Sequence, residues 1–151
     1  MTRFAARTHI AAPPQRVFDL SLRVETHTAA MAASGEHAVG GVTSGQLSLG
    51  DTVTWEARHF GLTWRLTSVI SAFDRPVSFT DEQVSGPFRR WHHVHRFEPD
   101  GQGGTVMHDI VEFAAPLGPL GRIAEFAVLN RYLPGLIRMR NEHIGEAARS
   151  C

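Results

Sequence analysis

The sequence contains no lysine, because all 15 of its basic residues are arginine. This absence excludes Schiff-base catalysis and phosphate loops that depend on a lysine side chain. The only cysteine is Cys151, so an intramolecular disulfide is impossible. The chain has no apolar run of about 18 residues and no apolar signal segment at its start. We therefore expect a cytoplasmic protein without membrane insertion.

Net charge is also absent, since 15 acidic residues offset the 15 arginines. A chain without net charge lacks the long-range field that attracts nucleic acid or anionic lipid. The glycine pairs Gly40-Gly41 and Gly103-Gly104 match neither the dinucleotide-binding pattern nor the P-loop pattern. The sequence therefore predicts no nucleic-acid partner and no cofactor.

The composition suits one globular domain over residues 1–151. Hydrophobic residues make up 42% of the chain and charged residues 20%, close to the average of folded domains. A chain of this length buries about 70% of the surface that its unfolded form exposes. Such a core is large enough to contain a cavity.

The expected elements before residue 51 follow from apolar spacing and from proline and glycine. Alternation indicates a first strand, which the Pro13-Pro14 pair ends. Proline in a first helical turn costs no backbone hydrogen bond, so a helix begins there. The glycine-rich residues 35–50 predict a loop around one short strand. The expected order is strand, helix, short helix and short strand, over residues 3–10, 14–24, 28–33 and 36–42.

Beyond residue 50, runs rich in β-branched and aromatic residues alternate with turn signals such as Gly61 and Gly86-Pro87. Hairpin-linked strands of this kind form an antiparallel meander. The predicted strands cover residues 51–60, 62–73, 77–84, 88–97 and 105–114.

Residues after Pro119 show a helical period and predict one long C-terminal helix. One helical stripe consists of Leu129, Leu133, Leu136, Ile137, Arg140 and Ile144, and the first four of these residues would form the lid of a cavity. Pro134 removes a backbone hydrogen bond and is expected to kink the helix. The arginines of this segment are interpreted as solvated side chains balanced by nearby glutamates, namely Arg131, Arg138 and Arg140.

This order of elements, with the Pro13-Pro14-x-x-Val17-Phe18 start of the first helix, resembles the SRPBCC superfamily of START and birch-pollen-allergen-like proteins. The resemblance implies an α+β helix-grip fold, a bent antiparallel sheet of about six to seven strands wrapped around the C-terminal helix. It also implies a cavity between sheet and helix, but it transfers no catalytic residue. The segments most similar to bacterial members described as ligand-binding or cyclase/dehydrase-like cover residues 50–57, 81–88, 91–97 and 118–121.

Two histidines and an aspartate form the strongest functional signal. Alternation predicts inward faces on two neighbouring strands, consisting of Trp91, His93, His95 and Phe97, and of Met107, Asp109, Val111 and Phe113. Asp109 would then lie within reach of His93 or His95. Three interpretations stay open: a buried polar network that fixes sheet register, hydrogen bonding to a ligand, or acid–base catalysis.

The same three side chains could in principle hold a divalent metal. However, 9 histidines scattered over the chain produce such a pair by chance, and no cysteine or His-Glu-x-x-His motif accompanies it. We therefore predict no metal site.

Other inward positions are candidates for the wall of a cavity. The amide of Gln83 can both donate and accept a hydrogen bond, which suits a ligand hydroxyl or carbonyl. Asp81 shares the strand face of Gln83. The alternative to an inward face is that Asp81 lies near the solvent-exposed end of the strand and pairs with an arginine there. Trp55 and Trp64 either line the cavity or pack in the core.

The sequence is compatible with three functions. Binding of a small, largely hydrophobic molecule by a monomer or homodimer is favoured over catalysis. The predicted lining residues are Trp55, Trp64, Phe79, Gln83, Trp91, His93, His95, Met107, Asp109 and Leu133. The second function is a cyclase or dehydratase with His93 or His95 as base and Asp109 as orienting group. The third is an interaction module that uses the 35–50 loop and the kinked helix.

Overall fold

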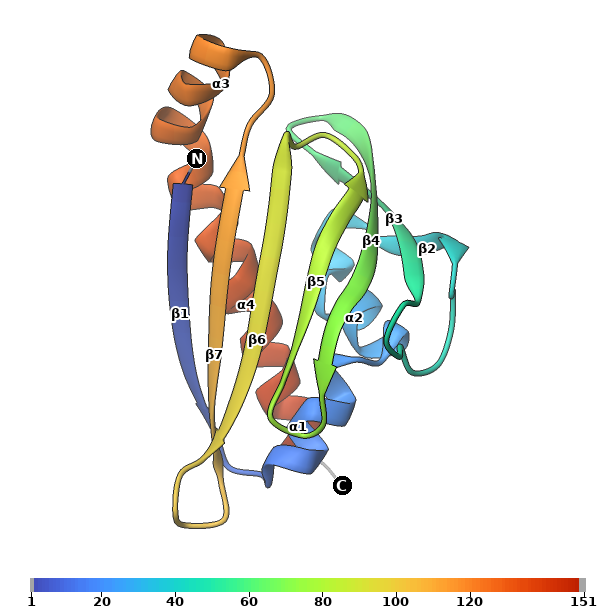
Figure 1. Ribbon diagram of the computed structural model, residues 1–151, viewed down its shortest axis with the longest axis vertical. Helices are drawn as coiled ribbons and strands as arrows, with labels where there is room; N and C mark the ends of the chain where they lie inside the picture. The colour runs from blue at the N-terminus through green and yellow to red at the C-terminus, as the bar shows by residue number, and fades with distance from the viewer. Residues whose placement is uncertain (1, 150–151) are drawn as a thin grey trace.

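The computed structural model describes residues 2–149, so Cys151 lies outside the described residues. Its strands form one 7-stranded antiparallel sheet in the order β1-β7-β6-β5-β4-β3-β2 (Figure 1). The strands are β1 (Thr2–Ile10), β2 (His37–Gly41), β3 (Thr52–His59), β4 (Leu62–Asp74), β5 (Ser78–Ser85), β6 (Arg90–Pro99) and β7 (Thr105–Ala114). The helices are α1 (Pro14–Ser21), α2 (Val24–Ala30), α3 (Gly118–Ala124) and α4 (Asn130–Arg149).

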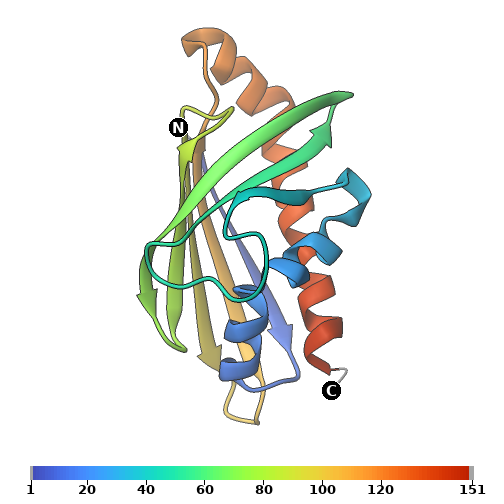
Figure 2. The same cartoon turned by 90° about the vertical axis from the view of Figure 1, so that its right-hand side faces the viewer.

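The sheet is strongly bent, and α4 lies along its concave side. Figure 2 shows β3 and β4 running diagonally to β1 and β7, with α4 extending along the molecule. Helix α4 contacts β1 near one edge of the sheet and also contacts α1 and α2. This arrangement confirms the predicted α+β helix-grip fold.

Alternation of buried and exposed positions explains why the strands adopt this sheet. In β7, Met107, Asp109, Val111 and Phe113 are each 0% exposed, so the predicted inward face of this strand is confirmed. On α1, the buried Phe18 makes edge contacts with Phe73, Phe79 and Phe97 at centroid distances of 5.5, 5.6 and 5.3 Å. These contacts fill the end of the sheet that α1 covers.

The two N-terminal helices differ from the prediction. Helix α1 ends at Ser21 instead of continuing to Val24, because Arg23 has an extended backbone and forms a β-bridge with Gln46. The second helix therefore begins at Val24 and ends at Ala30, earlier than the predicted residues 28–33. A 3₁₀ turn, Ala32–Ser34, follows it.

The C-terminal helix is continuous through Pro134, which lies inside α4. A π-helical turn, Glu125–Leu129, joins α3 to α4 before the proline. At this turn the N–H of Asn130 donates to the carbonyl of Glu125. None of the helices within residues 2–149 is long and apolar enough to cross a membrane.

Candidate functional site

A cavity of about 580 Å³ lies between the concave face of the sheet and the C-terminal helix. This volume is in the range of small-molecule sites. The walls from β3 and β4 consist of Val53, Trp55, Ala57, His59, Trp64, Leu66, Ser68 and Ile70. The helical side consists largely of Leu129, Tyr132, Leu133, Leu136, Ile137 and Arg140. Trp55 and Trp64 of the sheet and Leu129, Leu133, Leu136 and Ile137 of the helical side are at positions that the sequence predicts, whereas Tyr132 and Arg140 are additional.

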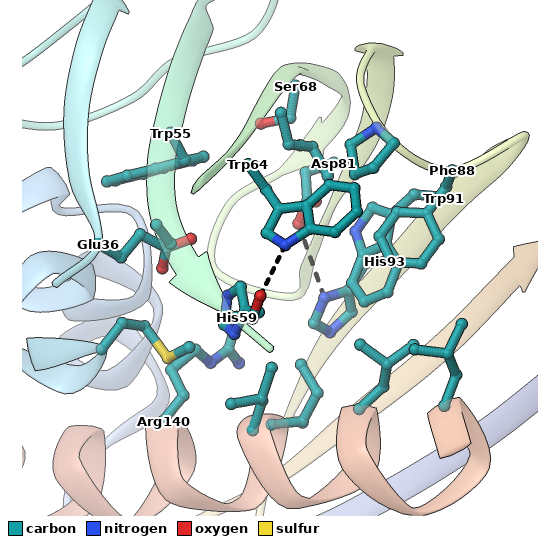
Figure 3. A pocket seen from close by; sticks show the side chains of 18 of the residues that line it. Glu36, Trp55, His59, Trp64, Ser68, Asp81, Phe88, Trp91, His93 and Arg140 are labelled. Carbon is teal, nitrogen blue, oxygen red and sulfur yellow. Dashed lines mark hydrogen bonds and ion pairs between the residues drawn. The ribbon is translucent and has the colours of Figure 1, made fainter. Parts of the chain in front are cut away.

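Aromatic side chains contribute much of the wall. All 3 tryptophans of the chain, Trp55, Trp64 and Trp91, line the cavity, as Figure 3 shows. Trp64 lies at the rim, 36% exposed, and its indole N–H donates to the carbonyl of His59 at 2.9 Å. Indole rings offer large apolar area to a ligand while their N–H groups keep a polar partner.

A buried polar cluster lies behind one side of the cavity, centred on the carboxylate of Asp109. Its Oδ1 accepts hydrogen bonds from Nε2 of His93 at 2.7 Å and from Nη2 of Arg140 at 2.9 Å. Its Oδ2 accepts from Nδ2 of Asn141 at 2.6 Å. The cluster links β6 and β7 to α4. Among the described residues, every buried side-chain N or O atom that is fully shielded from solvent has a hydrogen-bond partner.

His95 connects this cluster to Asp81. Its Nε2 donates to Oδ2 of Asp81 at 2.6 Å, while its Nδ1 lies 3.4 Å from Nη1 of Arg140. A guanidinium can only donate, so Nδ1 of His95 must be the unprotonated nitrogen. His95 is therefore neutral, with its proton on Nε2.

The pKa shifts agree with this assignment. Burial, opposed by the hydrogen bond to Asp81, lowers the pKa of His95 to about 3. Burial works to raise the pKa of Asp81, but its hydrogen bond to His95 and the nearby positive charges outweigh this and lower it to about 2. For Asp109, burial is likewise outweighed by Arg140 and His93, which hold its pKa well below the usual range. Both aspartates are ionised at neutral pH.

Two polar atoms of this region face the cavity without a hydrogen bond among the described residues. Nε2 of His93 donates to Asp109, so Nδ1 is the ring nitrogen left for a molecule in the cavity. Nδ1 lies 3.9 Å from Oδ2 of Asp81, too far for a hydrogen bond. Oδ1 of Asp81 also has no hydrogen bond, and the Asp81 side chain is 20% exposed. In Figure 3, Asp81 and His93 approach the pocket from the sheet and Arg140 from α4.

Asp81, His93 and His95 also form the group among residues 2–149 that could hold a metal ion, with ligand atoms within 4.8 Å of one another. This set contains Asp81 in place of the Asp109 considered from the sequence. The two rings are stacked, 3.7 Å apart at 21°. Arg140 places a positive charge beside His95, which opposes the binding of a cation by this ring.

Comparison with known proteins identifies the family. A sequence model described as polyketide cyclase / dehydrase and lipid transport matches residues 1–148. The chain belongs to this family. No match was found among curated protein sequences.

Solved structures share the fold of this cyclase/dehydrase and lipid transport family. The protein TTHA0849 of Thermus thermophilus is 20% identical with a TM-score of 0.76, over 99% of this chain and 100% of that one. A START superfamily protein from Mycobacterium smegmatis is 11% identical with a TM-score of 0.72, over 96% and 98%. The ZhuI aromatase/cyclase from a Streptomyces species is 12% identical with a TM-score of 0.68, over 94% and 93%. At these identities the likeness concerns the fold alone.

Most of the predicted lining residues of this family member meet in the cavity. Those that line it are Trp55, Trp64, Phe79, Trp91, His93, His95 and Leu133. Met107, although inward-facing, lies beneath α1, with its sulfur 4.0 Å from Oγ of Ser21. Asp109 is likewise inward but is covered by Arg140 and Asn141.

Gln83 does not line the cavity. Its amide donates to the carbonyl of Phe88 at 2.7 Å and accepts from the N–H of Phe88 at 3.2 Å. Both halves of the amide thus hold the turn between β5 and β6, and neither is available to a ligand.

Two charged residues have roles that the sequence interpretation missed. Asp81 was expected either on an inward face or at the wet end with an arginine; it lies inside, bonded to His95. Arg140 was interpreted as solvated, but it is 6% exposed and bonded to Asp109. Its position on the apolar stripe between Ile137 and Ile144 was the available signal. Arg131 and Arg138 are exposed as predicted.

Apolar side chains are exposed around α3, at one end of the cavity. Leu117, Leu120, Ile123 and Phe126 are 76%, 68%, 63% and 84% exposed. Leu117 and Leu120 also line the cavity, so this surface is continuous with its interior. An apolar patch on the outside of the C-terminal segment favours the interaction-module hypothesis, which stays a prediction.

Proposed function

We propose that this protein binds a small, largely hydrophobic molecule in the cavity between sheet and helix, as a cytoplasmic carrier, sensor or storage protein. The single observation that carries the proposal is the cavity itself, with aromatic and aliphatic walls and unpartnered acceptor atoms on one side. Sites of this volume and lining bury most of the surface of a drug-sized ligand, while a few polar groups fix its orientation. Membership of a family described by lipid transport and polyketide chemistry supports it.

Filling the cavity is expected to abolish binding. Ala57 is buried and lines the cavity from β3, so Ala57→Phe places a ring in the ligand's space. Nile red, a neutral dye that brightens in apolar surroundings, should bind the native protein and bind Ala57→Phe at least about tenfold more weakly. The measurement is a fluorescence titration.

The matched control is Ala5→Phe, the same change at an exposed position of β1. It should leave the dye affinity unchanged. Equal affinities of Ala57→Phe and the native protein, with both folded by circular dichroism, would place the dye elsewhere and contradict the proposal.

A second candidate function is cyclase or dehydratase catalysis, and one observation favours it. The ring of His93 is oriented by Asp109 through Nε2 at 2.7 Å, and its Nδ1 faces the cavity. A carboxylate-oriented imidazole can act as a general base. On a β-hydroxy ketone, Nδ1 would remove the α-proton; the C–O bond then breaks, and the leaving oxygen takes that proton to depart as water.

His93→Gln is expected to slow such a dehydration by about 100-fold or more, because it removes the base. An aromatic β-hydroxy ketone serves as test substrate, and the conjugated enone is followed by its absorbance. Dye binding should persist in the variant. A native rate no faster than buffer, or an undiminished rate in His93→Gln, would leave the His93–Asp109 pair as a structural element.

A further inference from the structure

The acidic and basic side chains that line the cavity are not all paired with one another. Of the basic side chains that line it, Arg23 is exposed at the edge and Arg140 is engaged with Asp109 and Asn141. Of the acidic ones, Glu36 is paired with His27 at 2.6 Å. Asp81 remains, and its ionic partners within 4 Å are the two histidine rings, with no arginine among the described residues.

Asp81 is also more accessible than the arginine nearest to it. Its side chain is 20% exposed and that of Arg140 is 7% exposed. The hydrogen bond from His95 occupies only Oδ2, so Oδ1 can accept from a molecule in the cavity. Oδ1 is thus a carboxylate oxygen without a hydrogen bond in largely apolar surroundings, and a charge-assisted hydrogen bond from a bound cation would satisfy it.

The groups beside Asp81 also suit a ligand that donates hydrogen bonds. Nε2 of His93 is held by Asp109, so a neutral His93 ring presents Nδ1 as an acceptor. The ring of Trp91 lies next to His93, at a centroid distance of 6.1 Å, and presents an aromatic surface that favours cations. Donors on a ligand would therefore be matched here, whereas a second carboxylate would meet like charge.

We infer that the ligand of this cavity carries a protonated amine that binds Oδ1 of Asp81, with the remainder of an aromatic or aliphatic body against the tryptophan walls. This inference rests on the proposed binding function and names its ligand class: apolar amines, in preference to neutral alcohols and to carboxylic acids. Charge-assisted hydrogen bonds are roughly twice as strong as neutral ones, which sets the order of preference.

Three probes with one aromatic body test the inference: naphthylethylamine, naphthylethanol and naphthylacetic acid, titrated into the native protein by calorimetry at neutral pH. The amine should bind at least about tenfold more tightly than the acid, with the alcohol between them. In Asp81→Asn this preference should fall to about threefold or less. Asp74→Asn removes the same charge from an exposed position on β4 and should retain the native preference.

Binding of Nile red distinguishes failure of the inferred ligand class from failure of the proposed binding function. If the dye binds but the acid binds as tightly as the amine, or no probe shows the preference, the inference is overturned and the cavity function stands. An unchanged preference in Asp81→Asn also overturns it. If neither dye nor probes bind, the proposed function fails together with the inference.

Discussion

Replacing Arg140 by methionine is expected to lower the free energy of unfolding by about 3–5 kcal/mol. The guanidinium donates to Asp109, which is 0% exposed, and its charge keeps that carboxylate ionised. Methionine keeps the length and apolar contacts of the side chain but leaves a buried charge without its partner. Urea denaturation at neutral pH measures the loss.

A double-mutant cycle separates charge from packing in this prediction. Asp109→Asn combined with Arg140→Met removes both charges and should be more stable than Arg140→Met alone, because no unpaired charge remains. Arg138→Met, an exposed position on the same helix, should change stability by no more than about 0.5 kcal/mol. A loss below about 1 kcal/mol in Arg140→Met would show that Asp109 does not depend on this arginine.

Acidification is expected to destabilise the protein through His95. The pKa of His95 is about 3 in the folded protein and 6.5 ordinarily. Between these two pH values, His95 binds a proton in the unfolded chain but not in the folded protein. Stability from this group is therefore complete above pH 6.5 and is lost as the pH falls towards 3. One proton corresponds to about 1.4 kcal/mol per pH unit within this window.

The variant His95→Gln should flatten this dependence, because glutamine cannot ionise but can still donate to Asp81. Urea denaturation of both proteins across the window gives the two slopes, which should differ by about one proton between about pH 6 and pH 4. Below the ordinary aspartate pKa of 3.8, Asp81 adds a further loss as the pH falls towards its folded value of about 2. Equal slopes above about pH 4 would mean that His95 is protonated in the folded protein.

Strand faces were predictable because alternation is a local property. The apolar residues around His93 and His95 identify the inward face of β6, and the strict alternation of β7 does the same for Asp109. Helical spacing likewise identified the stripe of α4 that closes the cavity. Each of these features depends on residues close together in the chain.

The sequence did not show which element covers each inward-facing side chain. This explains why Met107 and Asp109 face inward but do not line the cavity. Met107 and Asp109 face inward like Val111, but α1 covers Met107, and two side chains from α4 cover Asp109. Whether an inward residue meets a cavity or a helix depends on where the helices cross the sheet. Gln83 lies neither at the cavity nor beneath a helix, because its amide is hydrogen-bonded to the turn between β5 and β6.

By itself, the sequence determined the fold class, the faces of the strands and the stripe of the long helix, because apolar periodicity dictates which side chains leave water. Only the tertiary structure decided the partners within the polar cluster. Register places Asp81 opposite His93 and His95 opposite Asp109, while the rotation of α4 brings Arg140 onto Asp109. These contacts join segments far apart in the chain, and a buried charge selects its partner by distance in space.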